Sequence, residues 1–171
     1  MNIIFAGTTG VHYALVAAFL YLGQVQPGWS IDHLPGFGDM TLDSNEFPIY
    51  LGTDAKGNRV FSLGLGKQDD MGLKIIDSLL AAACVGKNSL VIKKIDIPEA
   101  RLFIILGKLA SFPGGQWLNK RFSVNLIKRR FAIIQKQIDE TEIQKYDVER
   151  FVGKIIITKK MIGAVYVSTN Y

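Results

Sequence analysis

The residues best suited to chemistry form one short loop near the start of the chain. The loop follows an apolar run at 2–6 and leads into a longer apolar run, as expected where a strand turns into a helix. Its glycines let backbone N–H groups approach an anion, its threonine hydroxyls can donate hydrogen bonds, and a helix start carries partial positive charge. We therefore predict a site for a phosphate-bearing small molecule. The candidate ligand-binding residues are Gly7, Thr8, Thr9, Gly10 and His12.

His12 is the candidate catalytic residue of this loop, and two interpretations of it stay open. The positive end of the helix disfavours the imidazolium form, so His12 should be neutral at pH 7 and act as a hydrogen-bond donor or general base. In the other interpretation it is a core or capping histidine that makes one backbone hydrogen bond. The loop matches neither the P-loop nor the dinucleotide-binding pattern, so a glycine turn that only reverses the chain also explains it.

Other candidate residues carry weaker signals. His33 lies in the irregular segment 24–46, part of which we expect to close over the first loop. The stretch 64–67, Gly-Leu-Gly-Lys, could form a second anion cradle, although a strand exit with a solvated lysine is the simpler interpretation. Asp54 lies in a predicted hairpin turn, where Asp commonly bonds its own backbone. No metal-ligand spacing and no cofactor pattern is present, so we predict no metal and no identifiable cofactor.

Positive charge is concentrated in one part of the chain. The segment 101–138 contains eight Lys or Arg residues and no acidic residue, which more than accounts for the net charge of +5. This basic block can attract phosphate, nucleic acid or an acidic membrane surface, while a solvated face balanced by acids elsewhere is the simpler explanation. If the block serves the first loop, it should form a positive surface beside Gly10. Nucleic acid ranks last, because beyond Trp117, Phe122 and Phe131 no aromatic residues interleave with the basic block in a stacking pattern.

Strand-like and helix-like patterns alternate along the chain. This alternation predicts an α/β fold of three layers with a mostly parallel sheet, Rossmann-like or P-loop-like, and a β-hairpin insertion. We expect residues 1–145 to form a single α/β domain and 146–171 to add a β-hairpin at the sheet edge. The predicted strands are Asn2–Ala6, Pro48–Gly52, Arg59–Leu63, Leu90–Ile92 and Phe122–Ile127. The predicted helices are Val11–Leu22, one from Asp69 or Asp70 to near Gly86, Pro98–Leu109 and Arg129–Ile138.

The sequence also predicts a location. Its single cysteine, Cys84, excludes an intrachain disulfide and is typical of a reducing compartment. The apolar stretch Ile3–Leu22 has about the length of a membrane span. The loop 7–10 and His12 interrupt it, however, and no Lys or Arg precedes it. We therefore expect a cytoplasmic protein without a membrane span.

Three motifs together resemble an uncharacterised family of Gram-positive bacteria, domain of unknown function 3189. Segment 5–23 is similar to the family's first strand, histidine-containing turn and alanine-rich helix, and it keeps Gly10 and His12. Segment 34–37, Leu-Pro-Gly-Phe, and the hairpin at 52–61 match two further motifs. The resemblance implies the same fold and a shared loop. It supplies no reaction, because the family has no assigned activity.

The chain departs from the family at polar positions around the histidine. Where the family has one threonine and two serines, this sequence has Val11, Tyr13 and Ala14, and Tyr21 replaces a histidine at the helix end. Three hydroxyl groups that could hold an anion are therefore missing. Two functions from different classes stay open. One is a small-molecule site at the first loop, and the other is a non-catalytic binding or regulatory module that uses the basic block.

Overall fold

The computed structural model describes residues 1–26, 28–44, 47–67, 69–82 and 90–140. Cys84, the helix end expected near Gly86 and the hairpin expected in 146–171 lie outside these ranges. The boundary between a domain at 1–145 and its extension therefore stays a prediction.

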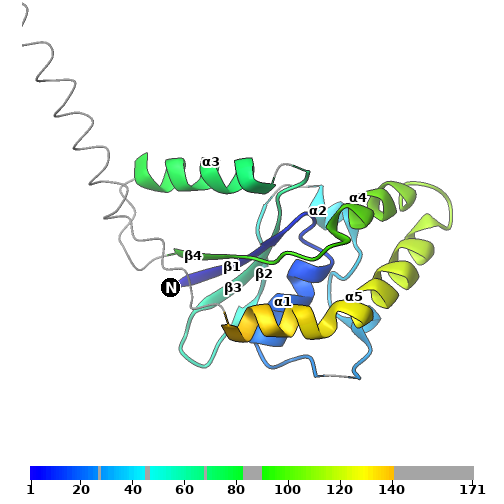
Figure 1. The fold of residues 1–171 in the computed structure, drawn as a ribbon, viewed down its shortest axis with the longest axis horizontal. Helices are drawn as coiled ribbons and strands as arrows, with labels where there is room; N and C mark the ends of the chain where they lie inside the picture. Colours follow the sequence, from blue (N-terminus) through cyan, green and yellow to red (C-terminus); the bar gives the residue numbers. More distant parts are fainter. Residues whose placement is uncertain (27, 45–46, 68, 83–89, 141–171) are drawn as a thin grey trace, which may run out of the picture.

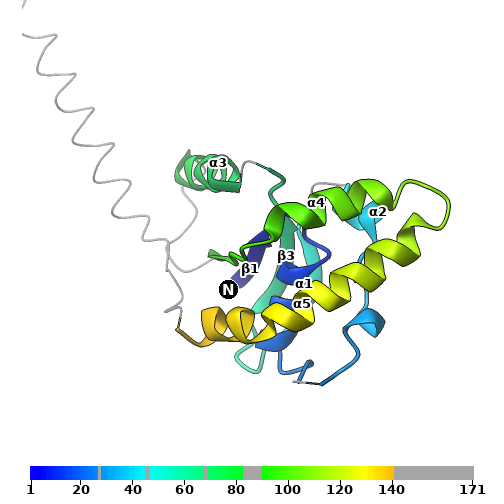
Figure 2. The same ribbon diagram turned by 45° about the vertical axis from the view of Figure 1, so that its right-hand side comes forward.

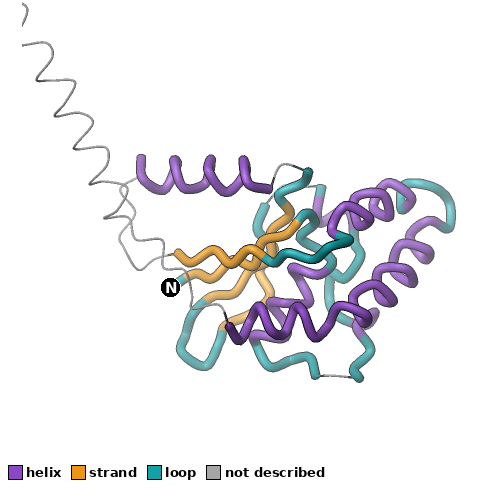
Figure 3. The backbone as a smooth tube through the Cα atoms, viewed as in Figure 1, coloured by secondary structure: helices purple, strands orange, loops and turns teal. Residues whose placement is uncertain are grey.

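A four-stranded mixed sheet forms the centre of the described fold (Figure 3). Its strands are β1 (Asn2–Gly7), β2 (Ile49–Thr53), β3 (Arg59–Gly64) and β4 (Leu90–Lys94), in the order β2-β3-β1-β4. β1 pairs in parallel with β3 and β4, and β2 and β3 form the predicted antiparallel hairpin. β1 takes a central place because both of its faces are apolar. Ile3 and Phe5 are buried on one face, and Ile4 and Ala6 on the other.

Helices cover both faces of this sheet, so the predicted α/β class with a mostly parallel sheet is confirmed. The helices are α1 (Tyr13–Tyr21), α2 (Met40–Asp43), α3 (Asp69–Ala82), α4 (Ala100–Leu109) and α5 (Gly115–Glu140), with a short 3-10 turn, η1, at Ile31–His33. α1 and α5 pack on the face of Ile3 and Phe5, whereas α3 covers the other face (Figure 1). In the described part of the chain, no helix has the length and apolar character needed to cross a bilayer.

α5 covers a stretch of sequence for which the pattern predicts two separate elements. The strand predicted at Phe122–Ile127 is wrong, because one helix continues through it and through the helix predicted at Arg129–Ile138. β-branched and aromatic residues in 122–127 suggested a strand, but packing against α1 overrides this local preference. The buried side chains show the longer helical period: Asn119, Ser123, Ile127 and Ile134 lie on one side of the helix.

α4 and α5 form a helical hairpin that projects from the sheet (Figure 2). At the end nearest the sheet, the Arg130 guanidinium donates to both carboxylate oxygens of Glu99, with Nε at 3.0 and 2.9 Å. The opposite end of the hairpin is the short connection 110–114, which lies far from the strands (Figures 1 and 2).

Candidate functional site

The carboxyl ends of β1 and β3 form the candidate ligand-binding edge of the sheet. β1 leads into α1 on one face and β3 leads into α3 on the opposite face, so the chain diverges between two neighbouring strands (Figure 1). Ligands of open α/β sheets bind at such points. The two glycine loops singled out in the sequence, 7–10 and 64–67, meet there.

The backbones of the two loops approach so closely at this point that each loop needs a glycine there. A Cβ atom on Gly10 would lie 2.8 Å from the backbone nitrogen of Gly64. Two backbone N–H groups that follow Gly64 donate to carbonyl oxygens of the first loop, at 2.8 and 3.1 Å. The two loops therefore form one structural unit.

Asp43, which the sequence analysis did not single out, occupies the anion position of this unit. It is the last residue of α2, and its Oδ1 accepts a hydrogen bond of 2.6 Å from the Gly10 N–H. Burial raises the pKa of the Asp43 carboxyl group, and the Gly10 hydrogen bond partly opposes that rise. Asp39 caps α2 by accepting from Thr41 N–H at 3.0 Å, which is the local signal that could have predicted this short helix.

Tyr13 supports the loop from beneath. Its hydroxyl accepts a 2.5 Å hydrogen bond from Thr8 N–H and donates to Thr8 Oγ1 at 3.0 Å. Thr8 Oγ1 in turn donates to Ala100 O at 3.0 Å, at the start of α4. A Cβ atom on Gly7 would lie 2.5 Å from the Tyr13 ring, so glycine is needed there. The residue that replaces a serine of the resembled family therefore returns a hydroxyl group to the loop.

His12 is completely buried and links three parts of the fold. Its Nδ1 lies 2.8 Å from Thr9 Oγ1 and its Nε2 lies 3.1 Å from Asn119 Oδ1 on α5. Asn119 Nδ2 donates to Gly38 O at 3.2 Å, so the amide oxygen faces the histidine. Nε2 therefore carries the proton, and Nδ1 accepts from Thr9. The ring packs beside Phe37 and Phe103.

The environment of His12 keeps it neutral, as the sequence predicts, but for a different main reason. Burial lowers the pKa of His12 to about 4, while the hydrogen bond to Asn119 acts in the opposite direction. Both ring nitrogens have protein partners, and His12 lines neither of two cavities that the described residues form at this edge of the sheet. The geometry thus assigns His12 a positioning role, holding the first loop against α5.

The first of these cavities, the Asp43 crevice, lies between the loops and α3. Its polar wall consists of Thr8, Asp43 and the glycines of the second loop, and its volume is about 660 Å³. Its other wall is apolar and includes Ile4, Leu63 and Ile76. A carboxylate at the end of an apolar crevice attracts hydrogen-bond donors or cations and disfavours phosphate.

The second cavity lies on the other side of Thr8 and has the opposite charge. We call it the basic cavity, because Lys67, Arg101 and Lys108 line it together with Thr8. Its volume is about 810 Å³, and no acidic residue belongs to its described lining. The remaining lining residues are Ile97, Pro98, Ala100, Ile104 and Ile105.

The basic block of 101–138 divides between several surfaces. Arg101 and Lys108 line the basic cavity together with Thr8 of the first loop. Arg130 instead pairs with Glu99. Lys120 and Lys128 line a hollow at the surface of α5.

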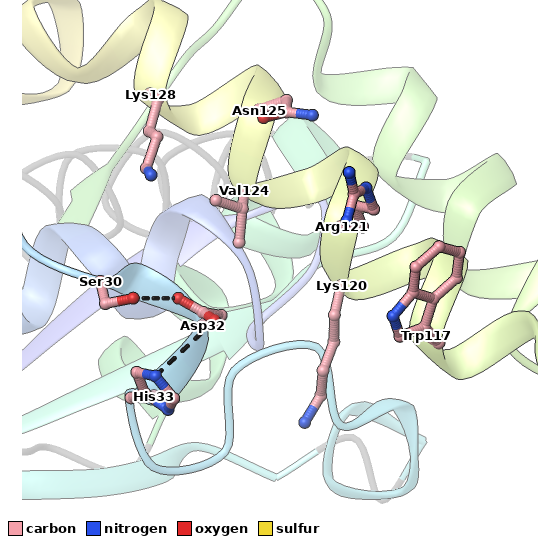
Figure 4. Close-up of a pocket in the computed structure, with 9 residues that line it drawn as sticks. All are labelled: Ser30, Asp32, His33, Trp117, Lys120, Arg121, Val124, Asn125 and Lys128. Atoms are coloured by element: carbon pink, nitrogen blue, oxygen red, sulfur yellow. Dashed lines mark hydrogen bonds and ion pairs between the residues drawn. The ribbon is translucent and has the colours of Figure 1, made fainter.

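This hollow also contains His33, which the structure does not bring to the first loop (Figure 4). The His33 side chain is 82% exposed and lies 3.9 Å from Asp32. The later part of the same segment packs as core: Phe37 is buried, and Gly38 N–H donates to Val11 O at 2.9 Å. Segment 34–38 thus packs against the first turn as part of the core.

The fold and its edge define an α/β protein with a mixed four-stranded sheet and two cavities of opposite charge beside one glycine loop. The chain belongs to the family described as "Protein of unknown function (DUF3189)", whose model matches residues 2–142. The match extends through all five helices and confirms the resemblance seen in the first motifs. No curated protein and no solved structure matches the chain.

Proposed function

We propose that this protein binds a small phosphate-bearing molecule in the basic cavity. The observation that carries the proposal is that three exposed cationic side chains, Lys67, Arg101 and Lys108, line one cavity whose described lining contains no carboxylate. These cations come from two separate parts of the chain, the β3–α3 loop and α4. A phosphate group held among them would be attracted by all three charges.

The individual side chains suit this chemistry. The planar guanidinium of Arg101 can donate two parallel hydrogen bonds to phosphate oxygens, while the lysines act as mobile point charges. Thr8 borders the same cavity and connects it to the first glycine loop. The proposed ligand therefore contacts one residue of the predicted loop, Thr8.

The Asp43 carboxylate explains why phosphate would bind beside the loop and not within it. The Gly10 N–H already donates to Asp43. A phosphate placed there would face a negative charge and compete for the same donor. The basic cavity carries no such repulsion.

The size and apolar part of the cavity favour a ligand larger than a free phosphate ion. A volume of about 810 Å³ lies within the usual range for small-molecule sites, roughly 300–1,000 Å³. Side chains such as Ile97, Ile104 and Ile105 offer apolar contacts for a sugar or a ring. We therefore propose a nucleoside phosphate or sugar phosphate as the ligand class.

The proposal carries two further expectations. One is a Rossmann-like or P-loop-like relationship of the fold, supported by the β1–loop–α1 unit at the sheet edge. The other is a cytoplasmic location in a bacterial cell, supported by the single cysteine and by the sequence resemblance.

Thermal unfolding in the presence of ligands tests the proposal. We expect nucleoside monophosphates, sugar phosphates or pyrophosphate to raise the melting temperature of the wild-type protein, because a ligand that binds only the folded state stabilises it. Arg101→Gln should remove most of this rise. Lys56→Gln is the matched control, because Lys56 lies in the β2–β3 turn at the opposite end of the sheet.

The control variant should respond to ligand as the wild type does. A melting temperature that stays constant across the phosphate compounds in the wild-type protein would exclude the proposal. If Arg101→Gln and Lys56→Gln lost the response equally, the rise in melting temperature would come from general charge attraction and not from the basic cavity.

A further inference from the structure

The free end of the α4–α5 hairpin exposes large apolar side chains. Phe112 and Trp117 are 67% and 62% exposed, well above what a packed core allows. The hairpin tip, as we define it, consists of Leu109, Phe112, Trp117, Leu118 and Phe122, and every one of these side chains is exposed. Several large exposed apolar residues gathered in one short segment indicate an interaction surface.

The charged side chains within the tip segment 109–122 are both cationic, although Asp39 lies near enough to Lys120 for the lysine to lower its pKa. Lys120 and Arg121 lie within the tip segment, and no acidic residue occurs anywhere in 101–138. The Arg121 guanidinium lies over the Trp117 ring, 5.3 Å from its centroid. An exposed aromatic residue and a cation thus form one unit at the surface.

The tip is also placed to meet a broad surface. In both ribbon views the connection 110–114 is the part of the hairpin most distant from the sheet (Figures 1 and 2). Beside it, the side chains of Trp117, Lys120, Arg121 and Lys128 project from α5 around the hollow shown in Figure 4. Asp32 is the acidic member of the described lining of this hollow, and it accepts a 2.6 Å hydrogen bond from Ser30.

We propose that the hairpin tip docks on the surface of an anionic lipid bilayer. Phe112, Trp117 and Leu118 enter the boundary between headgroups and acyl chains, while Lys120 and Arg121 contact lipid phosphates. Surfaces that combine Trp and Phe with Lys and Arg bind this boundary. The anionic headgroups attract the positive charge of Lys120 and Arg121. This docking is independent of the ligand proposed for the basic cavity.

The mixture of side chains favours lipid over the other anionic partner, single-stranded nucleic acid. Nucleic acid gains affinity from aromatic stacking and phosphate contacts. The tip adds the aliphatic Leu109 and Leu118, and Leu102 on α4 is exposed as well. Aliphatic groups contribute little to stacking but bury well among acyl chains.

Sedimentation of the full chain with lipid vesicles tests this docking. We expect binding to vesicles of mixed phosphatidylglycerol and phosphatidylcholine, weaker binding at high salt, and no binding to pure phosphatidylcholine. The double variant Phe112→Ser, Trp117→Ser should bind the anionic vesicles roughly tenfold or more weakly. Lys120→Gln with Arg121→Gln should reduce binding comparably, because two cations that attract the anionic surface are lost.

Matched controls lie elsewhere on the described surface. Phe47→Ser removes an aromatic side chain that is 76% exposed, and Lys56→Gln with Lys74→Gln removes two exposed lysines. Both controls should bind vesicles as the wild type does. Because all substituted side chains are exposed, circular dichroism and thermal unfolding should show folded protein in every variant.

Tryptophan fluorescence gives a second readout. The sequence has two tryptophans, so Trp29→Phe leaves Trp117 as the reporter. Its emission should shift to the blue on anionic vesicles and stay unchanged on neutral ones. An unchanged emission on both, or vesicle binding that the tip variants leave intact, would overturn the proposal. So would tip-dependent binding of a single-stranded oligonucleotide, or tip-dependent dimer formation, without vesicle binding.

Discussion

The Gly10 N–H donates a hydrogen bond to Asp43 Oδ1 at 2.6 Å, so a carboxylate of the chain itself fills the anion position of the first glycine loop. The raised pKa of Asp43 shows that its burial disfavours the ionised form. Ionised Asp43 therefore costs stability at neutral pH. This cost falls as the pH drops through the raised pKa, because the folded state then takes up the proton.

Asp43→Asn should make the protein more stable at pH 7, since the amide oxygen can still accept from Gly10 while the buried charge is gone. The difference in melting temperature between variant and wild type should shrink as the pH is lowered and the Asp43 carboxyl group takes up its proton. The variant should also bind phosphate compounds more tightly, because a nearby negative charge is removed. A variant that is less stable than wild type at every pH would show that the carboxylate itself is needed.

His12 predicts a separate pH effect. Its folded-state pKa of about 4 lies below the ordinary 6.5, so neutral His12 contributes its full stability above pH 6.5 and loses it between pH 6.5 and 4. That difference corresponds to about 3 kcal/mol in the free energy of unfolding. Denaturant titrations across this range should show the loss in wild type but not in His12→Gln. His33→Gln serves as the control, because the His33 side chain is exposed.

The contact between His12 and Asn119 should be measurable as a coupling energy. Asn119 orients the imidazole, donates to Gly38 O and accepts from Ser123 Oγ, so its removal takes a partner from three buried groups. His12→Gln and Asn119→Ala should each destabilise the protein. A double-mutant cycle should give a coupling of about 0.5–3 kcal/mol. Strict additivity would mean that the two side chains stabilise the fold independently.

Two glycine substitutions should have opposite effects. Gly64→Ala places a Cβ atom 2.5 Å from Asp43 Oδ1 and 2.8 Å from the Gly10 nitrogen, so the sheet edge must deform. A loss of roughly 1–3 kcal/mol is expected. Gly72→Ala meets only the flexible end of Leu65 at 3.1 Å, within α3. It should leave stability unchanged or raise it by up to about 1 kcal/mol, because alanine favours helix. Equal losses in both variants would contradict the role given to backbone approach.

The elements predicted correctly are those whose secondary structure follows from the pattern of apolar and turn residues within the element itself. β1 and α1 are apolar on every face, and the β2–β3 hairpin carries turn residues between two β-rich runs. The strand predicted at 122–127 is wrong because this part of α5 is fixed by packing against α4 and α1, which local composition does not reveal.

Only part of the candidate site could be predicted, because the rest depends on contacts between residues far apart in the sequence. The sequence identified the first loop, but the partners that decide its chemistry lie far along the chain. Asp43 is 33 positions from Gly10, and Asn119 is 107 positions from His12. The charge of the basic block was evident from composition. Its division among the basic cavity, the hollow of Figure 4 and the Glu99 pair depends on how α4 and α5 pack.

Thr8 belongs to the walls of both the Asp43 crevice and the basic cavity. A molecule that moved Thr8 away from Ala100 O would change the walls of both cavities, because Thr8 lines each of them. Thermodynamic linkage then makes the effect reciprocal: the factor by which an occupant of the crevice changes affinity in the basic cavity equals the factor in the reverse direction. Binding of a ligand in one cavity would thus change the affinity of the other cavity for a ligand of opposite charge.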